Sequence, residues 1–277
     1  MVAVRRSPTM NVMVEAAEKA GRSLVRDFGE VENLQVSKKG PGDFVSTADH
    51  KAEKIVMETL LKSRPGYGFY MEEGGIKKGT DKSFVWIIDP LDGTTNFLHG
   101  LPHWAVSIAL EKDKEIIAGV VYDPIKDEMF MAEKGTGAFM RSKRLRVSSR
   151  SDMASSVIAI GGARTGDKQY EAYMAELDAI TPHVAGTRRW GAAALDIAYV
   201  AAGRYEGFWE RELNAWDVAA GSLIAREAGG YVTDISGGKD YIYGRSIVVG
   251  NPAIHAELLK KLKASGQKEE KKVKSAS

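Results

Sequence analysis

The most informative run of the sequence is FVWIIDPLDGTTNF, which spans residues 84–97. Its first five residues, Phe84 to Ile88, are apolar and indicate a short buried strand. Two carboxylates, Asp89 and Asp92, stand where that strand ends. A proline between them fixes one backbone angle, and the glycine that follows them permits a sharp bend. The two side chains can therefore converge on one point.

Paired carboxylates of this kind suit a hard divalent cation such as Mg²⁺, which prefers oxygen ligands. The backbone carbonyl of Leu91 could join them as a ligand. The N–H groups of Gly93 and Thr94 could open a helix, and a helix N-terminus binds phosphate. Carboxylates for a metal beside N–H groups for a phosphate indicate phosphoryl transfer. Taken alone, the same residues could also form an Asx-type turn that merely ends the strand.

Further acidic residues stand outside this run, and each has two readings. Glu72 and Glu73 follow a short apolar run and could supply a metal ligand or lie in a solvated loop. Asp217 stands in the segment AWDVAAG, residues 215–221, which predicts the start of a helix. It could bind a metal, or it could complete a capping box whose N-cap is Asn214. Considered alone, these acids are better explained by their structural roles.

The bulk composition narrows the class of protein. The chain has 277 residues, 44% of them hydrophobic, which is enough for one large domain or two packed halves. A net charge of +2 gives no sign of nucleic-acid or membrane-surface binding. The absence of cysteine excludes disulfides, thiolate zinc sites and a cysteine nucleophile. No apolar run approaches the roughly 18 residues of a membrane span, and no signal peptide is evident, so we expect a cytoplasmic protein.

Apolar spacing along the chain predicts helices interleaved with strands. In the first half, residues 10–28 and 47–63 have the spacing of amphipathic helices, and residues 104–112 and 115–123 read as an antiparallel hairpin. In the second half the predicted elements are strands at 157–160, 205–209 and 246–249, and helices at 167–180, 191–203, 215–228 and 253–263. This mixture indicates layered α/β sheets rather than a simple doubly wound domain.

Two segments are predicted to lack regular structure. The run Ser37 to Gly42 reads as a flexible loop. Residues 264–277 are mostly Lys, Glu, Ser, Gly and Gln. Such a segment cannot bury apolar area, so we expect a disordered, solubilising tail.

Together, the acidic segments resemble the inositol monophosphatase family, part of the lithium-sensitive phosphatase superfamily that includes the fructose-1,6-bisphosphatases. The first family signature is matched by WIIDPLDGTTNF at residues 86–97, and the second by WDVAAG at 216–221, followed by EAGG at 227–230. The upstream element G-x-x-x-E-E is present at residues 68–73, although Met71 replaces the family's usual glycine. The resemblance covers roughly residues 10–262.

The chain is most similar to bacterial members of the extragenic-suppressor type, with which it shares Arg188-Arg189 and the run AALD at 193–196. The resemblance implies an α+β, layered α/β fold: a five-layer αβαβα sandwich of the inositol monophosphatase and fructose-1,6-bisphosphatase type. The domain would span residues 8–263, with an α+β half at about 8–146 and an α/β half at about 147–263. It also implies a homodimer and inhibition by lithium.

The resemblance further implies two or three Mg²⁺ ions in each active site. The implied metal ligands are Glu72, Asp89, the carbonyl of Leu91, Asp92 and Asp217. Asp92 would bridge two of the ions, which would activate water and stabilise the leaving alkoxide without a covalent intermediate.

Catalytic and substrate-binding roles are implied in the same way. Thr94 would orient the attacking water with Asp49 as proton acceptor, and Glu72 would act beside them. Asp49 also has a local role, because Ser46 would be the N-cap of the helix that it begins. The implied substrate contacts are Asp92, Gly93, Thr94, the backbone N–H of Ala193, Glu210 and Asp217. Lys38 matches a lysine on a mobile loop near the site, and Ala192 replaces a residue that is often Thr or Ser.

The leading expected activity is hydrolysis of myo-inositol monophosphate to myo-inositol and phosphate. A related phosphatase acting on histidinol phosphate, fructose 1,6-bisphosphate, NADP or a nucleotide bisphosphate is the alternative within the same class. An interaction protein that keeps the phosphatase fold is the alternative of another class. Glu210 favours a polyol substrate, because a carboxylate can accept hydrogen bonds from neighbouring hydroxyls.

Overall fold

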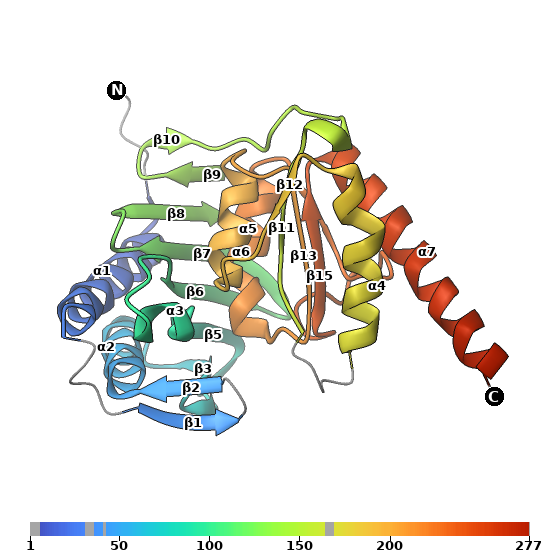
Figure 1. The fold of residues 1–277 in the computed structure, drawn as a ribbon. Coiled ribbons are helices and arrows are strands. Elements are labelled where there is room, and N and C mark those ends of the chain that lie inside the picture. Colours follow the sequence, from blue (N-terminus) through green and yellow to red (C-terminus); the bar gives the residue numbers. More distant parts are fainter. Residues whose placement is uncertain (1–5, 31–35, 41–42, 164–168, 277) are drawn as a thin grey trace.

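The chain folds into five layers, two sheets alternating with three layers of helices (Figure 1). A computed structural model describes residues 6–30, 36–40, 43–163 and 169–276. Helices α1 (Pro8–Phe28) and α2 (Thr47–Ser63) cover the outer face of an eight-stranded sheet. Helices α5 (Ala193–Ala201) and α6 (Ala215–Glu227) lie between this sheet and a five-stranded one, whose far face is covered by α4 (Tyr170–Ile180) and α7 (Pro252–Ala276). The predicted αβαβα sandwich is confirmed.

The eight-stranded sheet carries the acidic motif on one of its inner strands. Its order is β10-β9-β8-β7-β6-β5-β3-β4. In chain order its strands are β3 (Tyr67–Met71), β4 (Gly75–Lys77), β5 (Asp81–Asp92), β6 (Ala105–Lys112), β7 (Glu115–Asp123), β8 (Glu128–Glu133), β9 (Gly137–Met140) and β10 (Lys143–Arg144). Strand β5 is longer than its apolar run predicts, because its flanking residues also pair with β3 and β6.

The five-stranded sheet is mixed and has the order β12-β11-β13-β15-β14. Its strands are β11 (Val157–Ile160), β12 (Gly186–Arg188), β13 (Gly207–Arg211), β14 (Tyr231–Thr233) and β15 (Ser246–Gly250). Strand β11 runs parallel to β12 and to β13, whereas β15 is antiparallel to its neighbours. The carboxyl ends of β11 and β13 therefore meet at one edge of the sheet.

The middle helical layer packs closely because it is built from small side chains. All nine residues of α5 are buried, and most of them are Ala, Val, Leu or Ile. On the facing sheet, a Cβ added to Gly119 of β7 would lie 2.8 Å from the carbonyl oxygen of Ala220 in α6. Glycine at this position lets the helix backbone rest directly on the strand, as an added methyl group would overlap it.

Two segments differ from their predicted forms. Part of the run 37–42, predicted as a loop, lies in β1 (Val36–Gly40), which pairs antiparallel with β2 (Asp43–Ser46). Helix α7 continues to Ala276, through the segment from residue 264 for which the composition predicts disorder. Lys and Glu are good helix formers, so a solvated helix and a disordered tail have similar compositions. The remaining short elements are α3 (Thr94–Leu98) and the 3₁₀ helices Met153–Ser155 and Thr181–His183.

Candidate active site

The acidic motif forms a tight turn between the end of β5 and the start of α3. Asp89 Oδ1 accepts a hydrogen bond from the N–H of Leu91 at 2.9 Å, so the Asx-type turn considered from sequence is present. Gly93 follows with a φ of 92°, in the left-handed region that favours glycine. A Cβ at this position would also lie 3.1 Å from the carbonyl oxygen of His103. The turn buries both carboxylates, leaving Asp89 2% and Asp92 8% exposed.

Asp92 caps the beginning of α5. Its Oδ1 accepts the N–H of Ala193 at 3.2 Å, and its Oδ2 accepts the N–H of Ala194 at 2.8 Å. The first N–H groups of a helix have no partner within the helix, and the N-cap residue Ala192 has no side chain that could bond to them. The N–H of Ala193, expected from sequence to face a substrate hydroxyl, is therefore engaged by Asp92 in this structure.

Four carboxylates act on one another around this turn: Glu72, Asp89, Asp92 and Asp217. Burial, and then the charges of the other three, raise the pKa of Asp89 well above its ordinary value. Burial likewise raises the pKa of Asp92 to about 7. Like charges at close range raise one another's pKa in this way, and a bound cation removes the conflict.

The other two acids of this group come from separate layers. Asp217 lies in the first turn of α6, where its Oδ2 accepts the N–H of Asn214 at 2.6 Å in a complete capping box. Glu72 directly follows β3, and its N–H donates to the carbonyl of Ile88 at 3.2 Å. The next N–H, that of Glu73, donates to Glu53 Oε2 at 2.8 Å, a contact that sequence reasoning missed.

The donor set fits a hard cation. Every implied ligand is a carboxylate or a carbonyl oxygen, which is the chemistry that Mg²⁺ prefers. Within the described ranges of the chain, no group of three or more His, Asp or Glu side chains is arranged to hold a metal ion by itself. An open arrangement is compatible with Mg²⁺, because this ion keeps several waters among its ligands.

Asp49 and Thr94 lie together, although they are far apart in the sequence. The hydroxyl of Thr94 is 3.2 Å from Asp49 Oδ1 and 3.1 Å from the carbonyl oxygen of Leu91. Asp49 Oδ2 accepts the N–H of Ser46 at 2.9 Å and its hydroxyl at 2.6 Å, in the predicted capping box. Burial raises the pKa of Asp49. One carboxylate thus holds the start of α2 with one oxygen and reaches Thr94 with the other.

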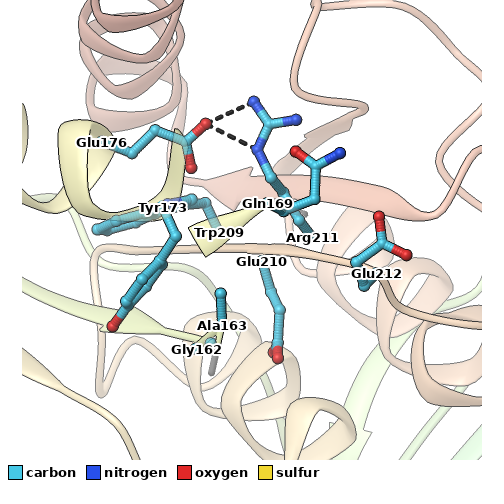
Figure 2. Close-up of a pocket in the computed structure, with 10 residues that line it drawn as sticks. Gly162, Ala163, Gln169, Tyr173, Glu176, Trp209, Glu210, Arg211 and Glu212 are labelled. Carbon is cyan, nitrogen blue, oxygen red and sulfur yellow. Dashed lines mark hydrogen bonds and ion pairs between the residues drawn. The ribbon is translucent and has the colours of Figure 1, made fainter. Parts of the chain in front are cut away.

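Glu210 lies near the end of β13, in the five-stranded sheet (Figure 2). Burial, followed by the charges of Asp217 and Asp92, raises the pKa of Glu210 to about 8. Its carboxyl group packs onto Gly161, where an added Cβ would lie 1.8 Å from Cδ of Glu210. The side chain that is expected to read substrate hydroxyls therefore shares the electrostatic environment of the acidic turn.

Two further residues near the turn had no predicted role. Asn96 Nδ2 donates to the carbonyl of His103 at 2.8 Å and to that of Trp190 at 2.6 Å, which ties α3 to the segment before α5. Asp196 is 1% exposed, and burial raises its pKa well above the ordinary value. Both belong to motifs visible in the sequence, but spacing alone does not show which groups they meet. Lys38 belongs to β1, and its side chain lies outside the described residues.

Comparisons with known proteins match nearly the whole chain. The model of the inositol monophosphatase family matches residues 5–267. A Mesorhizobium japonicum protein named inositol-1-monophosphatase is 57% identical over 258 residues, which cover 93% of this chain and 97% of that protein. An Escherichia coli protein named Nus factor SuhB is 42% identical over 252 residues, which cover 91% and 94%.

A solved structure gives the same result at the level of the fold. The crystal structure of the extragenic suppressor protein suhB from Bartonella henselae matches with a TM-score of 0.91 and 56% identity, covering 93% of this chain and 99% of that one. Sequence motifs, layer order and these matches agree over the folded part of the molecule. The chain belongs to the inositol monophosphatase family and is an enzyme of the phosphoric monoester hydrolase class.

Proposed function

We propose that this enzyme hydrolyses myo-inositol monophosphate in a reaction that depends on Mg²⁺. The observation that carries the proposal is the repulsion of two buried carboxylates, Asp89 and Asp92, by each other and by the half-buried Glu72 and Asp217, beside the start of a helix. Buried acids that repel one another are costly to a fold without a cation among them. The similarity to a protein named inositol-1-monophosphatase supports the substrate.

The chain's own oxygen atoms would hold the ions. Two or three Mg²⁺ ions would bind to Glu72, Asp89, the carbonyl of Leu91, Asp92 and Asp217. Bound Mg²⁺ would lower the pKa of a water molecule and stabilise the negative charge that develops on phosphate and leaving oxygens.

Thr94 and Asp49 would orient the attacking water and accept its proton. Asp49 is fixed by Ser46, so its Oδ1 stays within reach of the Thr94 hydroxyl. Thr94 can accept a hydrogen bond from the water while it donates its own proton to Asp49. This relay orients the water and draws its proton toward a buried carboxylate, as general base catalysis requires.

Glu210 would select a polyol. Its carboxyl group is placed beside the acids by β13 and can accept hydrogen bonds from ring hydroxyls. The related substrates histidinol phosphate, fructose 1,6-bisphosphate and NADP remain the alternatives within the same chemistry.

The experiment is a phosphatase assay across polyol, sugar, histidinol and nucleotide phosphates, with and without a chelator. We expect the highest kcat/KM for inositol monophosphate, loss of activity in excess chelator and recovery on addition of Mg²⁺. Full turnover in excess chelator would contradict the metal-dependent mechanism. A higher kcat/KM for another ester would show that the proposed substrate is wrong, but it would not contradict the metal-dependent mechanism. Inhibition by Li⁺ that substrate does not relieve is expected if Li⁺ replaces one Mg²⁺ after turnover.

We also propose that the chain is a cytoplasmic homodimer. The side chains of Leu101 and Trp190 are 52% and 48% exposed, and Asn96 links the two segments that carry them. Exposed aromatic and large apolar side chains are enriched where one protein binds another, so these two residues are the candidate contact surface. Across the described ranges, no helix is both long enough and apolar enough to cross a membrane.

A second candidate function is protein interaction on the phosphatase fold. The similarity to an Escherichia coli protein named Nus factor SuhB favours it. The two functions can be separated by variants, because changes at Asp92 should remove hydrolysis and leave the surface around Trp190 intact.

A further inference from the structure

The backbone is held on both sides of Glu72, one of the implied metal ligands. Glu72 stands in the short turn between β3 and β4, which pair antiparallel. Its own N–H donates to the carbonyl of Ile88 at 3.2 Å, and the N–H of Glu73 donates to Glu53 Oε2 at 2.8 Å. Because each peptide group is planar, these two bonds fix the two peptide planes that meet at the Cα of Glu72. The direction of the Glu72 side chain therefore depends on both of them.

The first of these bonds belongs to the sheet and ties Glu72 to the acidic motif. Ile88 is the residue directly before Asp89 in β5, and it pairs with Met71, the residue directly before Glu72 in β3. Burial, followed by the charge of Glu72, raises the pKa of Asp89, so the two carboxylates lie close to each other. Pairing of β3 with β5 thus brings Glu72 to the end of β5.

The second bond comes from a different layer, helix α2, which lies against the sheet beside β5 (Figure 1). Glu53 and Asp49 are four residues apart in α2, about one helical turn, so their side chains leave the same face of the helix. Asp49 is 0% and Glu53 7% exposed. A glutamate is seldom buried to this extent without a partner, and a bond from an N–H to a carboxylate is stronger than one to a neutral acceptor. One face of α2 therefore reaches Thr94 through Asp49 and the turn of Glu72 through Glu53.

Gly74 leaves room for the carboxyl group of Glu53 under the turn. A Cβ added at Gly74 would lie 2.7 Å from Glu53 Oε1 and 2.8 Å from Cε of Met71. The φ of Gly74 is outside the left-handed region, so space rather than backbone conformation requires glycine here. Both crowded atoms are the ends of flexible side chains. A larger residue at position 74 would therefore displace the Glu53 carboxyl group before it displaced the backbone.

We propose that Glu53 is a positioning residue for the metal site: its carboxylate holds the peptide group after Glu72, and it affects Mg²⁺ affinity through Glu72 alone. This inference rests on the proposed Mg²⁺-dependent function and adds to it a residue that supports a ligand from behind. Residues that orient metal ligands in this way commonly change metal affinity by about 10- to 100-fold when they are replaced.

The test measures binding of Mg²⁺ alone to the full chain, without substrate, by isothermal titration calorimetry. Glu53→Ala should raise the Mg²⁺ dissociation constant by about tenfold or more, because it leaves the N–H of Glu73 without this acceptor. Glu53→Gln should raise it by less than about threefold, because an amide oxygen can still accept that N–H. Unchanged affinity in Glu53→Ala would overturn the proposal. Equal losses in both variants would also overturn it, because the charge of Glu53 would then matter rather than its hydrogen bond.

A double-mutant cycle tests whether Glu53 acts through Glu72. Glu72→Gln should weaken Mg²⁺ binding, and adding Glu53→Ala to that variant should weaken it no further, since the ligand that Glu53 orients is already lost. A further tenfold loss in the double variant, or no loss in Glu72→Gln, would overturn the positioning role. An unchanged enzyme that binds no Mg²⁺ would instead refute the proposed function.

Leu60→Ala is the control for a loss of stability in the same helix. Leu60 is 0% exposed and lies seven residues beyond Glu53, about 10 Å along α2. Its truncation leaves a cavity and should destabilise the fold, with Mg²⁺ affinity unchanged. A loss of affinity in Leu60→Ala as large as that in Glu53→Ala would mean that Mg²⁺ binding simply follows stability, contrary to the proposal.

Gly74→Ala provides a second route that leaves Glu53 in the chain. The added methyl group should push the Glu53 carboxyl group away from the N–H of Glu73. We expect weaker Mg²⁺ binding in the same direction as for Glu53→Ala. Unaltered affinity in a folded Gly74→Ala protein would contradict the positioning role even if Glu53→Ala proved unstable.

Discussion

Asp92 binds the beginning of α5 and lies in the acidic turn, so its replacement tests the centre of the proposed site. Asp92→Asn keeps the shape of the side chain but removes its charge and one of the two acceptors for α5. We expect kcat to fall at least ~10²-fold, comparable to the loss of one major electrostatic stabiliser. Stability should change by no more than about 2 kcal/mol, because one unpaired N–H is offset by the loss of a buried charge. Steady-state kinetics and denaturant unfolding measure the two effects.

Asp196→Asn is the matched control for this variant. It removes a buried carboxylate of α5, the helix whose start Asp92 binds, and this carboxylate lies outside the acidic motif. A smaller loss of kcat than in Asp92→Asn is expected. Equal losses in the two variants would show that the general negative field, rather than Asp92 itself, matters for turnover.

His103 offers a test of stability against pH. Burial, followed by the charge of Lys126, lowers its pKa from 6.5 to about 4. Its Nε2 has no hydrogen-bond partner in the described part of the chain. Below pH 6.5 the imidazole of His103 is protonated in the unfolded chain but stays neutral in the folded chain. The free energy of unfolding therefore decreases as the pH falls from about 6.5 to about 4.

His103→Phe should remove this loss while keeping an aromatic ring against Trp190 and Tyr199. Relative to the variant, the unchanged protein should lose on the order of 2 kcal/mol between pH 7 and pH 4. Urea unfolding at several pH values gives the free energy of unfolding of both proteins. The carboxylates titrate alike in the two proteins, so their contribution largely cancels when one free energy is subtracted from the other. A constant difference across this range would show that His103 ionises normally.

Among the helices, the first residues of α2 both stabilise the helix and position a proposed catalytic carboxylate. Ser46 Oγ accepts the N–H of Ala48 at 3.2 Å and donates to Asp49 Oδ2 at 2.6 Å. Ser46→Ala should cost about 1 kcal/mol of stability as a lost helix cap. It should also lower kcat by about three- to tenfold, because Asp49 loses one of the bonds that aim it at Thr94.

Ser7→Ala separates these two effects. Ser7 caps α1 by accepting the N–H of Met10 at 3.0 Å, and it has no contact with the acidic turn. Ser7→Ala should lower the melting temperature by about as much as Ser46→Ala does, and it should leave kcat unchanged. A drop in kcat for Ser7→Ala as large as that for Ser46→Ala would mean that activity simply follows stability.

The elements that sequence reasoning predicted well carry their own boundary signals. Helix α2 begins and ends where predicted, because Ser46 caps it and Pro65-Gly66 follow it. The hairpin of β6 and β7 was predicted from the alternation of its first strand and from the short turn Asp113-Lys114. The hairpin of β1 and β2 was missed, since its lysines and glycines lack the apolar alternation that marks a strand.

Within the site, local contacts were predictable and distant ones were not. Capping boxes at Asp49 and Asp217 follow from spacing of three residues, and both are present. The bond from Ala193 to Asp92 joins residues 101 positions apart and depends on how the layers stack. The ion pair of Glu176 with Arg211 likewise joins residues 35 positions apart and depends on how α4 lies against the end of β13.

For the whole molecule, the exposed side chains near the site predict how two copies would meet. Leu101 and Trp190 should be covered in the proposed homodimer. Replacing both, as Leu101→Glu with Trp190→Glu, should yield a monomer, because charge at the centre of an interface is costly. Light scattering coupled to gel filtration gives the mass. Ile76→Glu, at a side chain that is 71% exposed elsewhere, should leave the dimer intact.

A dimer that survives the double replacement would place the interface on another surface. An unchanged protein that is monomeric at micromolar concentration would remove the proposal of a homodimer altogether. Neither result would contradict the proposed phosphatase function, because all the residues of the acidic turn come from one chain.

The double hydrogen bond from Asn96 connects the segment that carries the exposed Trp190 to α3, the helix that follows the acidic turn. This one amide joins α3 to the backbone of His103 and of Trp190, and the helix after Trp190 supplies the two N–H groups that hold Asp92. Any partner that binds around Trp190 and prefers one position of that segment also favours one position of Asp92. Linkage is reciprocal, so occupation of the acidic turn would then alter the affinity for that partner by the same factor. Replacement of Asn96 would therefore remove the side chain that joins these two places, and it should abolish any such mutual dependence of the two affinities.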